Sequence, residues 1–127
     1  MPANQKRVLV TGSRTYRDHQ RIKTALHSAW ILLGAPKDCV LVHGAADGAD
    51  LIAAQTWAAA GLPTDPHPVT KRQWRDIGGY AGNLRNERMV RKGADICLAF
   101  PNDDSSGTLH CIREAQEAGI PTFVLPE

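Results

Sequence analysis

Short apolar runs alternate along the chain with longer segments in which apolar residues recur every three or four positions. Such runs are typical of buried parallel strands, and the longer spacing is typical of helices with one apolar face. Each predicted helix ends at a glycine, which favours a stop there. We predict strands at residues 7–11, 39–43, 62–69, 95–100 and 121–125. Apolar stripes at residues 22–33, 51–59 and 109–118 predict three helices, of which the first is capped by Asp18, and a further helix is predicted at about residues 82–92.

The regular alternation of strand and helix predicts βαβ units, a parallel sheet and helices on both of its faces. The expected fold class is therefore α/β, an open, doubly wound sheet of about five strands. Residues 1–127 are one domain's worth of chain, so a single domain is expected. Three prolines within residues 62–69 lack backbone donors and place the third strand at a sheet edge. Residues 70–82 are predicted to be irregular, as a mobile flap.

The composition is typical of a globular domain and excludes few classes of function. Hydrophobic residues make up 43% and charged residues 22% of the chain, as in ordinary globular domains. The formal net charge of +2 is small for a dedicated DNA-binding protein. Cys39, Cys97 and Cys111 fall at apolar positions without metal-ligand spacing, so we interpret them as reduced core residues of an intracellular protein. No segment is long enough to span a membrane, and a cytoplasmic location is expected.

The loop between the fourth predicted strand and the last helix has the features of an anion site. Backbone N–H groups at a helix start have no intrahelical partner and carry the positive end of the helix dipole. After Pro101, the side chains of Ser105, Ser106 and Thr108 add hydroxyl donors. Gly107 allows a ligand to approach the backbone closely. The alternative is an ordinary turn capped by Ser106 or Thr108.

Two aspartates in the same loop, Asp103 and Asp104, would repel a phosphate if they pointed inward. We expect both side chains to face solvent. The alternative is that they hold a Mg²⁺ ion bound together with a nucleotide. Apart from this, the sequence predicts no metal ion or cofactor.

The loop after the first predicted strand lies where ligands bind in sheets of this class, beyond the carboxyl ends of the strands. Gly12, Ser13 and Thr15 are small, and Arg14 is suited to bidentate contact with a phosphate. The alternative is a tight turn with Arg14 in solvent. The loop lacks the Gly-x-Gly-x-x-Gly pattern of dinucleotide folds and the P-loop pattern, so NAD and kinase-type ATP chemistry are not supported.

The second loop contains His43, Gly44, Asp47, Gly48 and Asp50. Asp47 is placed to cap the following helix, and Asp50 lies in its first turn, where the dipole stabilises a carboxylate. Both are also candidates to bind ribose hydroxyls, as acidic residues do in nucleotide-binding folds. His43 at the strand end is either a packed, hydrogen-bonded residue or a general base.

The third predicted helix has a polar residue on its apolar face. Asn86 lies three and four residues before Met89 and Val90, so it needs a backbone or ligand partner. Arg85 gains nothing from the dipole near a helix start and is assigned to an anionic ligand, with a surface arginine as the alternative. Neighbouring basic and aromatic residues also suit a nucleic-acid face, which the low net charge disfavours. They are Lys71, Arg72, Trp74, Arg75, Tyr80, Arg88, Arg91 and Lys92.

Five segments together resemble the SLOG superfamily, and most closely its YspA-like (YpsA-related) branch, found in bacteria and phages. The segments are Val10 to Arg14, His43 to Asp50, Arg85 to Val90, Ala94 to Pro101, and Gly107 with Thr108. The resemblance covers nearly the whole chain. It implies a Rossmann-like fold that binds a nucleotide or a nucleotide-derived ligand.

Lonely Guy type phosphoribohydrolases, which release a base from a nucleoside monophosphate, resemble the chain more distantly. Arg85 and Met89 match one of their motifs at full spacing, so Arg85 is the candidate catalytic residue. Their Pro-Gly-Gly-x-Gly-Thr-x-x-Glu motif is matched only in part. Its catalytic Glu falls on Cys111, with His110 beside it, and neither is a carboxylate. Cleavage of an N-glycosidic bond favours a carboxylate, so this departure weakens the enzyme interpretation.

The leading interpretation is a sensor or accessory domain that binds a nucleotide or a nucleotide-derived ligand. The second is an N-glycoside hydrolase that uses Arg85 with an acid drawn from Asp47, Asp50, Asp103 or Asp104. The third is an accessory protein of nucleic-acid processing.

We also expect the first and fourth strands to be neighbours, so that residues 12–15 and 101–108 form two walls of one pocket with Arg85 at its mouth. Trp30 and Trp57 fall outside the main apolar stripes of their predicted helices, which indicates an exposed aromatic face through which the chain could form a homo-oligomer. The candidate ligand-binding residues are Gly12, Ser13, Arg14, Thr15, His43, Gly44, Asp47, Gly48, Asp50, Arg85, Asn86, Pro101, Ser105, Ser106, Gly107 and Thr108.

Overall fold

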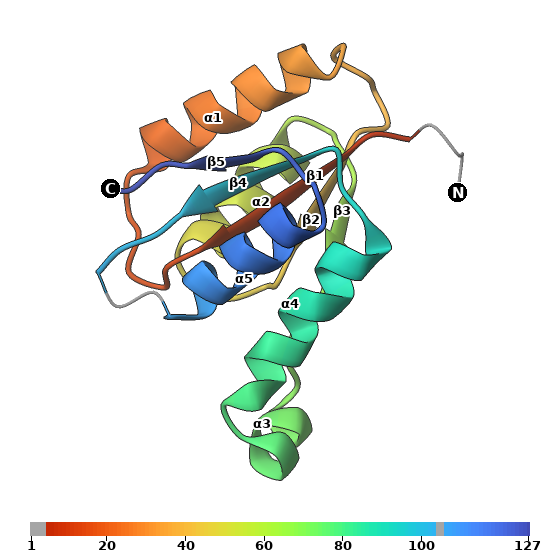
Figure 1. Ribbon diagram of the computed structural model, residues 1–127. Coiled ribbons are helices and arrows are strands. Elements are labelled where there is room, and N and C mark those ends of the chain that lie inside the picture. Colours follow the sequence, from red (N-terminus) through yellow and green to blue (C-terminus); the bar gives the residue numbers. More distant parts are fainter. Residues whose placement is uncertain (1–4, 104–105) are drawn as a thin grey trace.

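The computed structural model describes residues 5–103 and 106–127 (Figure 1). All five strands are parallel and lie in the order β3-β2-β1-β4-β5, which confirms the predicted α/β class and its Rossmann-like arrangement. The third strand pairs with β2 alone, at the sheet edge that its prolines predict. The strands are β1 Arg7–Gly12, β2 Val40–His43, β3 Thr64–Pro66, β4 Ile96–Phe100 and β5 Thr122–Val124; the helices are α1 His19–Leu32, α2 Ala49–Ala59, α3 Lys71–Ile77, α4 Tyr80–Lys92 and α5 Ser106–Glu117.

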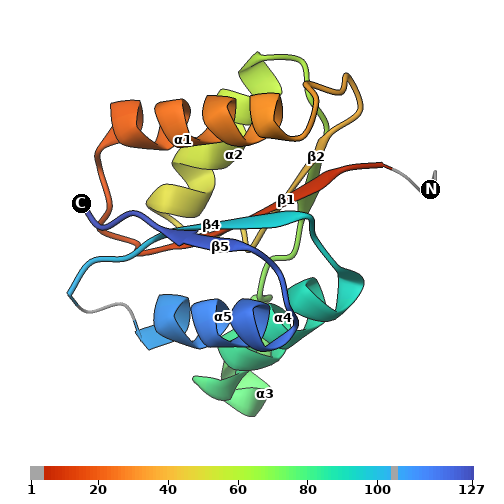
Figure 2. The ribbon, with the colours of Figure 1, turned by 45° about the horizontal axis from the view of Figure 1, so that its top comes forward.

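Helices cover both faces of the sheet, with α1 and α2 on one side and α4 and α5 on the other (Figure 2). The alternation of side chains along β1 separates the two layers. Val8 and Val10 pack in one buried cluster with residues of α1 and α2, whereas Leu9 packs in a second cluster with residues of α4 and α5. Because the central strands are buried on both faces, their sequences are continuously apolar.

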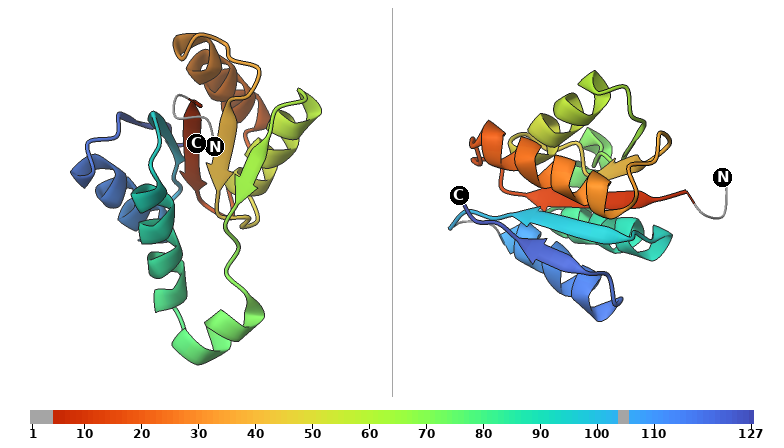
Figure 3. Two further views of the ribbon diagram at one scale, coloured as in Figure 1. Left: turned by 90° about the vertical axis from the view of Figure 1, so that its right-hand side faces the viewer. Right: turned by 90° about the horizontal axis from the view of Figure 1, so that it is seen from above.

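The strand order reverses between β1 and β4. From β1 the chain moves outward through β2 to β3, and it then returns to the other side of β1 to form β4 and β5 (Figure 3). Gly12, at the carboxyl end of β1, is the register partner of Phe100, at the carboxyl end of β4. The predicted adjacency of the first and fourth strands is therefore confirmed, and the loops that follow them lie together.

The N-terminus of α2 differs from the predicted cap. Gly48 occupies the N-cap position, and no side chain of the described residues, including that of Asp47, caps this helix. Gly48 has a φ of +81°, and a Cβ there would overlap the backbone of Ser13 and Arg14. The close contact of Gly48 with the loop after β1 therefore requires glycine at the N-cap of α2, and a residue with a capping carboxylate does not fit there.

Residues 70–82 are not the irregular flap that we predicted. They form α3 and the first residues of α4, which starts at Tyr80 rather than near Gly82. A capping box starts α3, because Thr70 Oγ1 accepts from the backbone of Gln73 while the Gln73 side chain accepts from the backbone of Thr70. With the N-terminal part of α4, this helix forms an arm that extends beyond the sheet (Figure 3, left).

Trp57 is buried rather than exposed, so it gives no indication of self-association. Its indole N–H donates to the backbone carbonyl of Cys39, and the half-buried Trp30 donates to that of Pro36. The three cysteines are free and buried, as predicted, and burial raises the pKa of the Cys39 thiol to about 11. Within the described residues, no helix is both long and apolar enough to cross a membrane.

Candidate functional site

A cavity of about 630 Å³ opens beyond the carboxyl ends of β1 and β4. Its walls come from the loop after β1, the start of α2, the arm formed by α3 and α4, and the first two turns of α5. Residues 12–15 and 106–108 lie on its walls. The first predicted wall is therefore present, whereas only the end of the second, predicted at residues 101–108, lines the cavity. These lining residues belong to the start of α5, and residues 101–103 of the loop lie outside the lining. The lining residues are Thr11, Gly12, Ser13, Arg14, Thr15, Ala46, Asp50, Trp74, Gly79, Gly82, Asn83, Arg85, Asn86, Met89, Ser106, Gly107, Thr108, His110 and Arg113.

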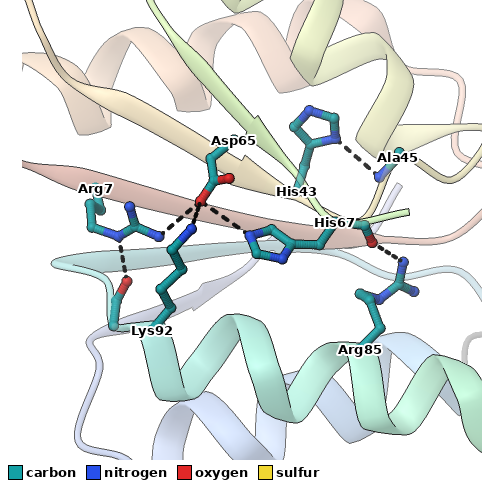
Figure 4. Close-up of polar contacts among 8 residues, drawn as sticks. Arg7, His43, Ala45, Asp65, His67, Arg85 and Lys92 are labelled. Atoms are coloured by element: carbon teal, nitrogen blue, oxygen red, sulfur yellow. Dashed lines mark hydrogen bonds and ion pairs between the residues drawn. The ribbon is translucent and has the colours of Figure 1, made fainter. Parts of the chain in front are cut away.

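Several predicted site residues lie outside this lining: His43, Gly44, Asp47, Gly48 and Pro101. The His43 ring is buried, and its Nδ1 accepts the backbone N–H of Ala45 at 3.0 Å (Figure 4). This contact is that of a packed, hydrogen-bonded histidine. Asp103 is exposed, as expected, whereas Asp104 and Ser105 lie outside the described residues.

The loop after β1 is fixed by local hydrogen bonds. Ser13 donates its backbone N–H to the carbonyl of Phe100 at 2.9 Å, and its hydroxyl lies 2.9 Å from that of Thr15. Asn102, from the loop after β4, donates to the Thr15 hydroxyl at 3.0 Å. A Cβ on Gly12 would overlap Ala49 and would lie 3.0 Å from the carbonyl oxygen of Phe100. The two walls are thus held together before any ligand binds.

Arg85 reaches from α4 across the loop after β2. Its Nη1 donates to the carbonyl of Gly44 at 2.7 Å. It also donates to the carbonyl of His67 at 3.4 Å (Figure 4). Its Nε donates to Oδ1 of Asn86 at 2.9 Å, and burial lowers its pKa. Gly44 lies directly under the guanidinium, where a Cβ would overlap it. Gly44 therefore positions Arg85 without lining the cavity.

Asn86 has the partners that its place on an apolar helix face requires. It is 3% exposed, and its amide donates to the carbonyl of Gly107 at 3.1 Å. The amide nitrogen also lies 3.3 Å from Nδ1 of His110. Because Asn86 accepts from Arg85 and donates to α5, it links the arginine to the helix that forms the opposite wall.

Asp50 is the one carboxylate among the described residues that line the cavity, and it is 4% exposed. Its Oδ2 accepts the backbone N–H of Gly44 at 3.0 Å. Burial raises the pKa of this carboxyl to about 6, although the Arg85 guanidinium and the backbone N–H groups of Gly44 and Ala46 act in the opposite direction.

Several lining residues are absent from the sequence-based candidates, and three of them, Trp74, His110 and Arg113, carry aromatic or cationic side chains. Trp74 of α3 lies against Arg14, whose guanidinium carbon is 5.8 Å from the ring centroid. His110 and Arg113 follow Gly107 by three and six residues, on the same face of α5. The helical period from Gly107 could have identified these two, and the capping box could have identified the helix that carries Trp74.

Glu87, His110 and Glu114 form a cluster of metal-ligand type at the interface of α4 and α5. The His110 Nε2 lies 3.8 Å from Glu87 and 3.4 Å from Glu114. The Asn86 amide donates toward Nδ1, so the imidazole proton belongs on Nε2, between the carboxylates. This tautomer suits a hydrogen-bonded triad and leaves no Nε2 lone pair for a metal ion.

The fold and the cavity define a class: a Rossmann-like α/β domain with an arginine-rich pocket at the point where strand order reverses. Residues 6–68 match the family model described as YAcAr: YspA, cpYpsA-related SLOG family. The chain is also 48% identical over 122 residues to the Gene 61 protein of Mycobacterium phage D29, covering 93% of this chain and 94% of that protein. The chain therefore belongs to the YspA, cpYpsA-related SLOG family, which confirms the resemblance seen in its motifs.

Proposed function

We propose that the cavity binds a nucleotide or a nucleotide-derived ligand, as in a sensor or accessory domain. The observation that carries this proposal is the charge balance among the described residues of the lining, where Arg14, Arg85 and Arg113 accompany one carboxylate, Asp50. A cavity with this excess of arginines attracts anions, and guanidinium groups suit phosphate oxygens in particular. Family membership supports the same class of ligand.

The two ends of such a ligand match different parts of the lining. The first turn of α5, with Gly107 and Thr108, presents backbone N–H groups that have no partner within the helix and suit a phosphate, and Arg113 lies on the same helix. Trp74 offers an aromatic surface on which a base stacks. We therefore place the phosphate against α5 and the base against α3.

Titration of the purified chain with nucleosides, nucleoside monophosphates and nucleoside diphosphates tests this proposal. We expect the phosphorylated ligands to bind, and Arg14→Gln or Arg113→Gln to weaken their binding about tenfold or more. Both residues are exposed, so neither change should alter the midpoint of thermal unfolding much.

Arg91→Gln is the matched control, since it removes the same charge from an exposed residue of α4 that does not line the cavity. If all three variants weaken binding equally, net charge rather than this cavity attracts the ligand. If nucleosides bind as well as their phosphates do, the cavity does not recognise phosphate.

A second candidate function is hydrolysis of the N-glycosidic bond of a nucleoside monophosphate. The buried Asp50 carboxyl, whose pKa is raised to about 6, favours it, because it lines the same cavity as Arg85. In this reaction the bond from C1′ to the base nitrogen breaks, Asp50 gives its proton to the leaving base, and water adds to C1′ and returns a proton to Asp50. Asp47 and Asp103, the other described candidates for the acid, are exposed and lie outside the lining.

Incubation with nucleoside monophosphates, followed by chromatography for free base and ribose 5-phosphate, separates the two functions. Release that Asp50→Asn abolishes and Asp47→Asn preserves would establish the hydrolase. Binding without any release of base would establish the ligand-binding function alone.

A further inference from the structure

One oxygen of Asp50 makes no hydrogen bond of good geometry within the described part of the protein. Oδ2 accepts from the backbone of Gly44, whereas Oδ1 is buried and has no hydrogen-bond partner. The backbone N–H of Ala46 lies near enough to the carboxyl to lower its pKa, but it forms no such bond to Oδ1. A carboxylate oxygen removed from water without a donor is costly, so native structures almost always supply one. Since Asp50 lines the cavity, the cavity is the side from which a donor can arrive.

The neighbouring arginines do not supply this donor. Arg85 Nη1 donates to the carbonyls of Gly44 and His67, and Nε donates to Asn86. The ion pairs found among the described residues, at up to 4.0 Å, include none to Asp50. The guanidinium of Arg14 lies instead against the Trp74 ring. These cations favour the ionised carboxylate through space without satisfying Oδ1.

The surroundings restrict the chemistry of the missing donor. Three arginines line the same cavity, so a cationic donor is repelled and a neutral hydroxyl or N–H is favoured. Asp50 lines the same cavity as Trp74, on the side proposed for the base, and as Gly107 and Thr108, on the side proposed for the phosphate. In a nucleotide the sugar joins the base to the phosphate, so it is the part of the ligand that crosses the cavity between these two sides.

We propose that a secondary hydroxyl of the ligand's ribose donates a hydrogen bond to Oδ1 of Asp50, so that the site selects a ribonucleotide over its deoxy counterpart. This inference rests on the proposed binding function and adds the sugar to it. It assigns the recognition to Asp50 rather than to Asp47, which is exposed and outside the lining.

Calorimetric titration of the wild-type protein gives the first test, which needs no variant. The probes are the adenosine, guanosine, cytidine and uridine 5′-monophosphates and 5′-diphosphates, each with its 2′-deoxy and 3′-deoxy form. We expect the loss of one of the two hydroxyls to raise the dissociation constant about tenfold or more, because a hydrogen bond to a charged group is lost.

Asp50→Asn supplies the second test. The amide oxygen of the substituted side chain can still accept from Gly44, which turns its NH₂ group toward the cavity and replaces an acceptor by a donor. We expect the ratio of ribo to deoxy affinity to fall toward one in this variant. Asp47→Asn, three residues earlier, is the matched control and should keep the wild-type ratio.

Three other results would contradict either the role of Asp50 or the binding function itself. Nucleotides that bind with equal affinity whether or not they carry the hydroxyl would overturn the role of Asp50 while leaving the binding function intact. A ratio that is the same in the wild type and in Asp50→Asn would assign the hydroxyl to another residue. If none of the nucleotides binds, the proposed function fails, and the ribose contact fails with it.

Discussion

At the scale of single residues, two glycines beside the cavity differ in what an added side chain would meet. A Cβ on Gly44 would overlap the Arg85 guanidinium and would lie 3.0 Å from Oδ2 of Asp50, whereas a Cβ on Gly107 would meet no atom of the described residues within 4 Å. Glycine is therefore required at Gly44 by packing. At Gly107 the described residues give no steric reason for glycine.

We predict that Gly44→Ala displaces Arg85 and lowers the free energy of unfolding by roughly 1–3 kcal/mol, as overpacking does elsewhere. Unfolding by urea measures this effect. Gly79→Ala is the control, because Gly79 has a φ of −59° and open space around its Cβ, so its effect should stay within about 0.5 kcal/mol. Equal losses in the two variants would mean that Gly44 is not needed to seat Arg85.

Gly107→Ala should separate stability from binding. Alanine is favoured over glycine inside a helix by roughly 0.5–1 kcal/mol, so the thermal midpoint should rise. If a phosphate lies against this turn of α5, the new methyl group should weaken nucleotide binding at the same time. A variant that is both more stable and equally competent to bind would place the phosphate away from Gly107.

At the scale of elements, the sequence predicts the strands and helices whose apolar residues are buried in the core. It does not predict an element without buried residues, or a contact between residues far apart in the chain. β1 and β4 are continuously apolar because both of their faces are buried, so their positions and the loops beyond them follow from the sequence. α3 has seven residues and no buried side chain, so it carries no apolar stripe. The position of Asp47 favours a cap by local rules, but the contact of Gly48 with a distant loop overrides them. The orientation of Arg85 likewise depends on contacts across the fold.

The aromatic side chain on α3 provides a test of the arm as a wall of the cavity. Trp74 is 38% exposed, so Trp74→Ala should change stability little but weaken nucleotide binding about tenfold, as expected when a stacked base loses its platform. Trp74→Phe should retain part of the affinity. Tyr80→Ala is the control, because Tyr80 is more exposed and does not line the cavity. An equal loss of affinity in the Trp74→Ala and Tyr80→Ala variants would argue against stacking at Trp74.

At the scale of the whole molecule, one carboxylate joins the edge of the sheet to its central strand and to the C-terminal end of α4. Asp65 on β3 pairs with Arg7 of β1 at 3.3 Å, with Lys92 at the end of α4 at 2.9 Å, and with His67 at 3.1 Å (Figure 4). The carbonyl of His67 in turn accepts from Arg85. His67 therefore connects the ion pairs of the edge strand β3 with Arg85, one of the arginines that line the cavity.

This network predicts how stability changes in acid. Burial by itself raises the pKa of Asp65, but hydrogen bonds from Lys92, His67 and Arg7 outweigh it and hold the pKa at about 2, below the ordinary value of 3.8. The folded state therefore favours the ionised carboxylate, so its contribution is fully present well above pH 4 and is lost as the pH falls toward 2. We expect a contribution of about 1–2 kcal/mol to the free energy of unfolding after solvent screening.

Urea unfolding of the wild type and of Asp65→Asn between pH 7 and pH 2.5 measures this contribution. The two curves of unfolding free energy against pH should converge in acid. Asp76→Asn, which removes an exposed carboxylate beside Arg72 and Arg75, should give a curve parallel to the wild type. If the Asp65→Asn curve also runs parallel, the ion pairs of Asp65 do not contribute to the pH dependence of folding.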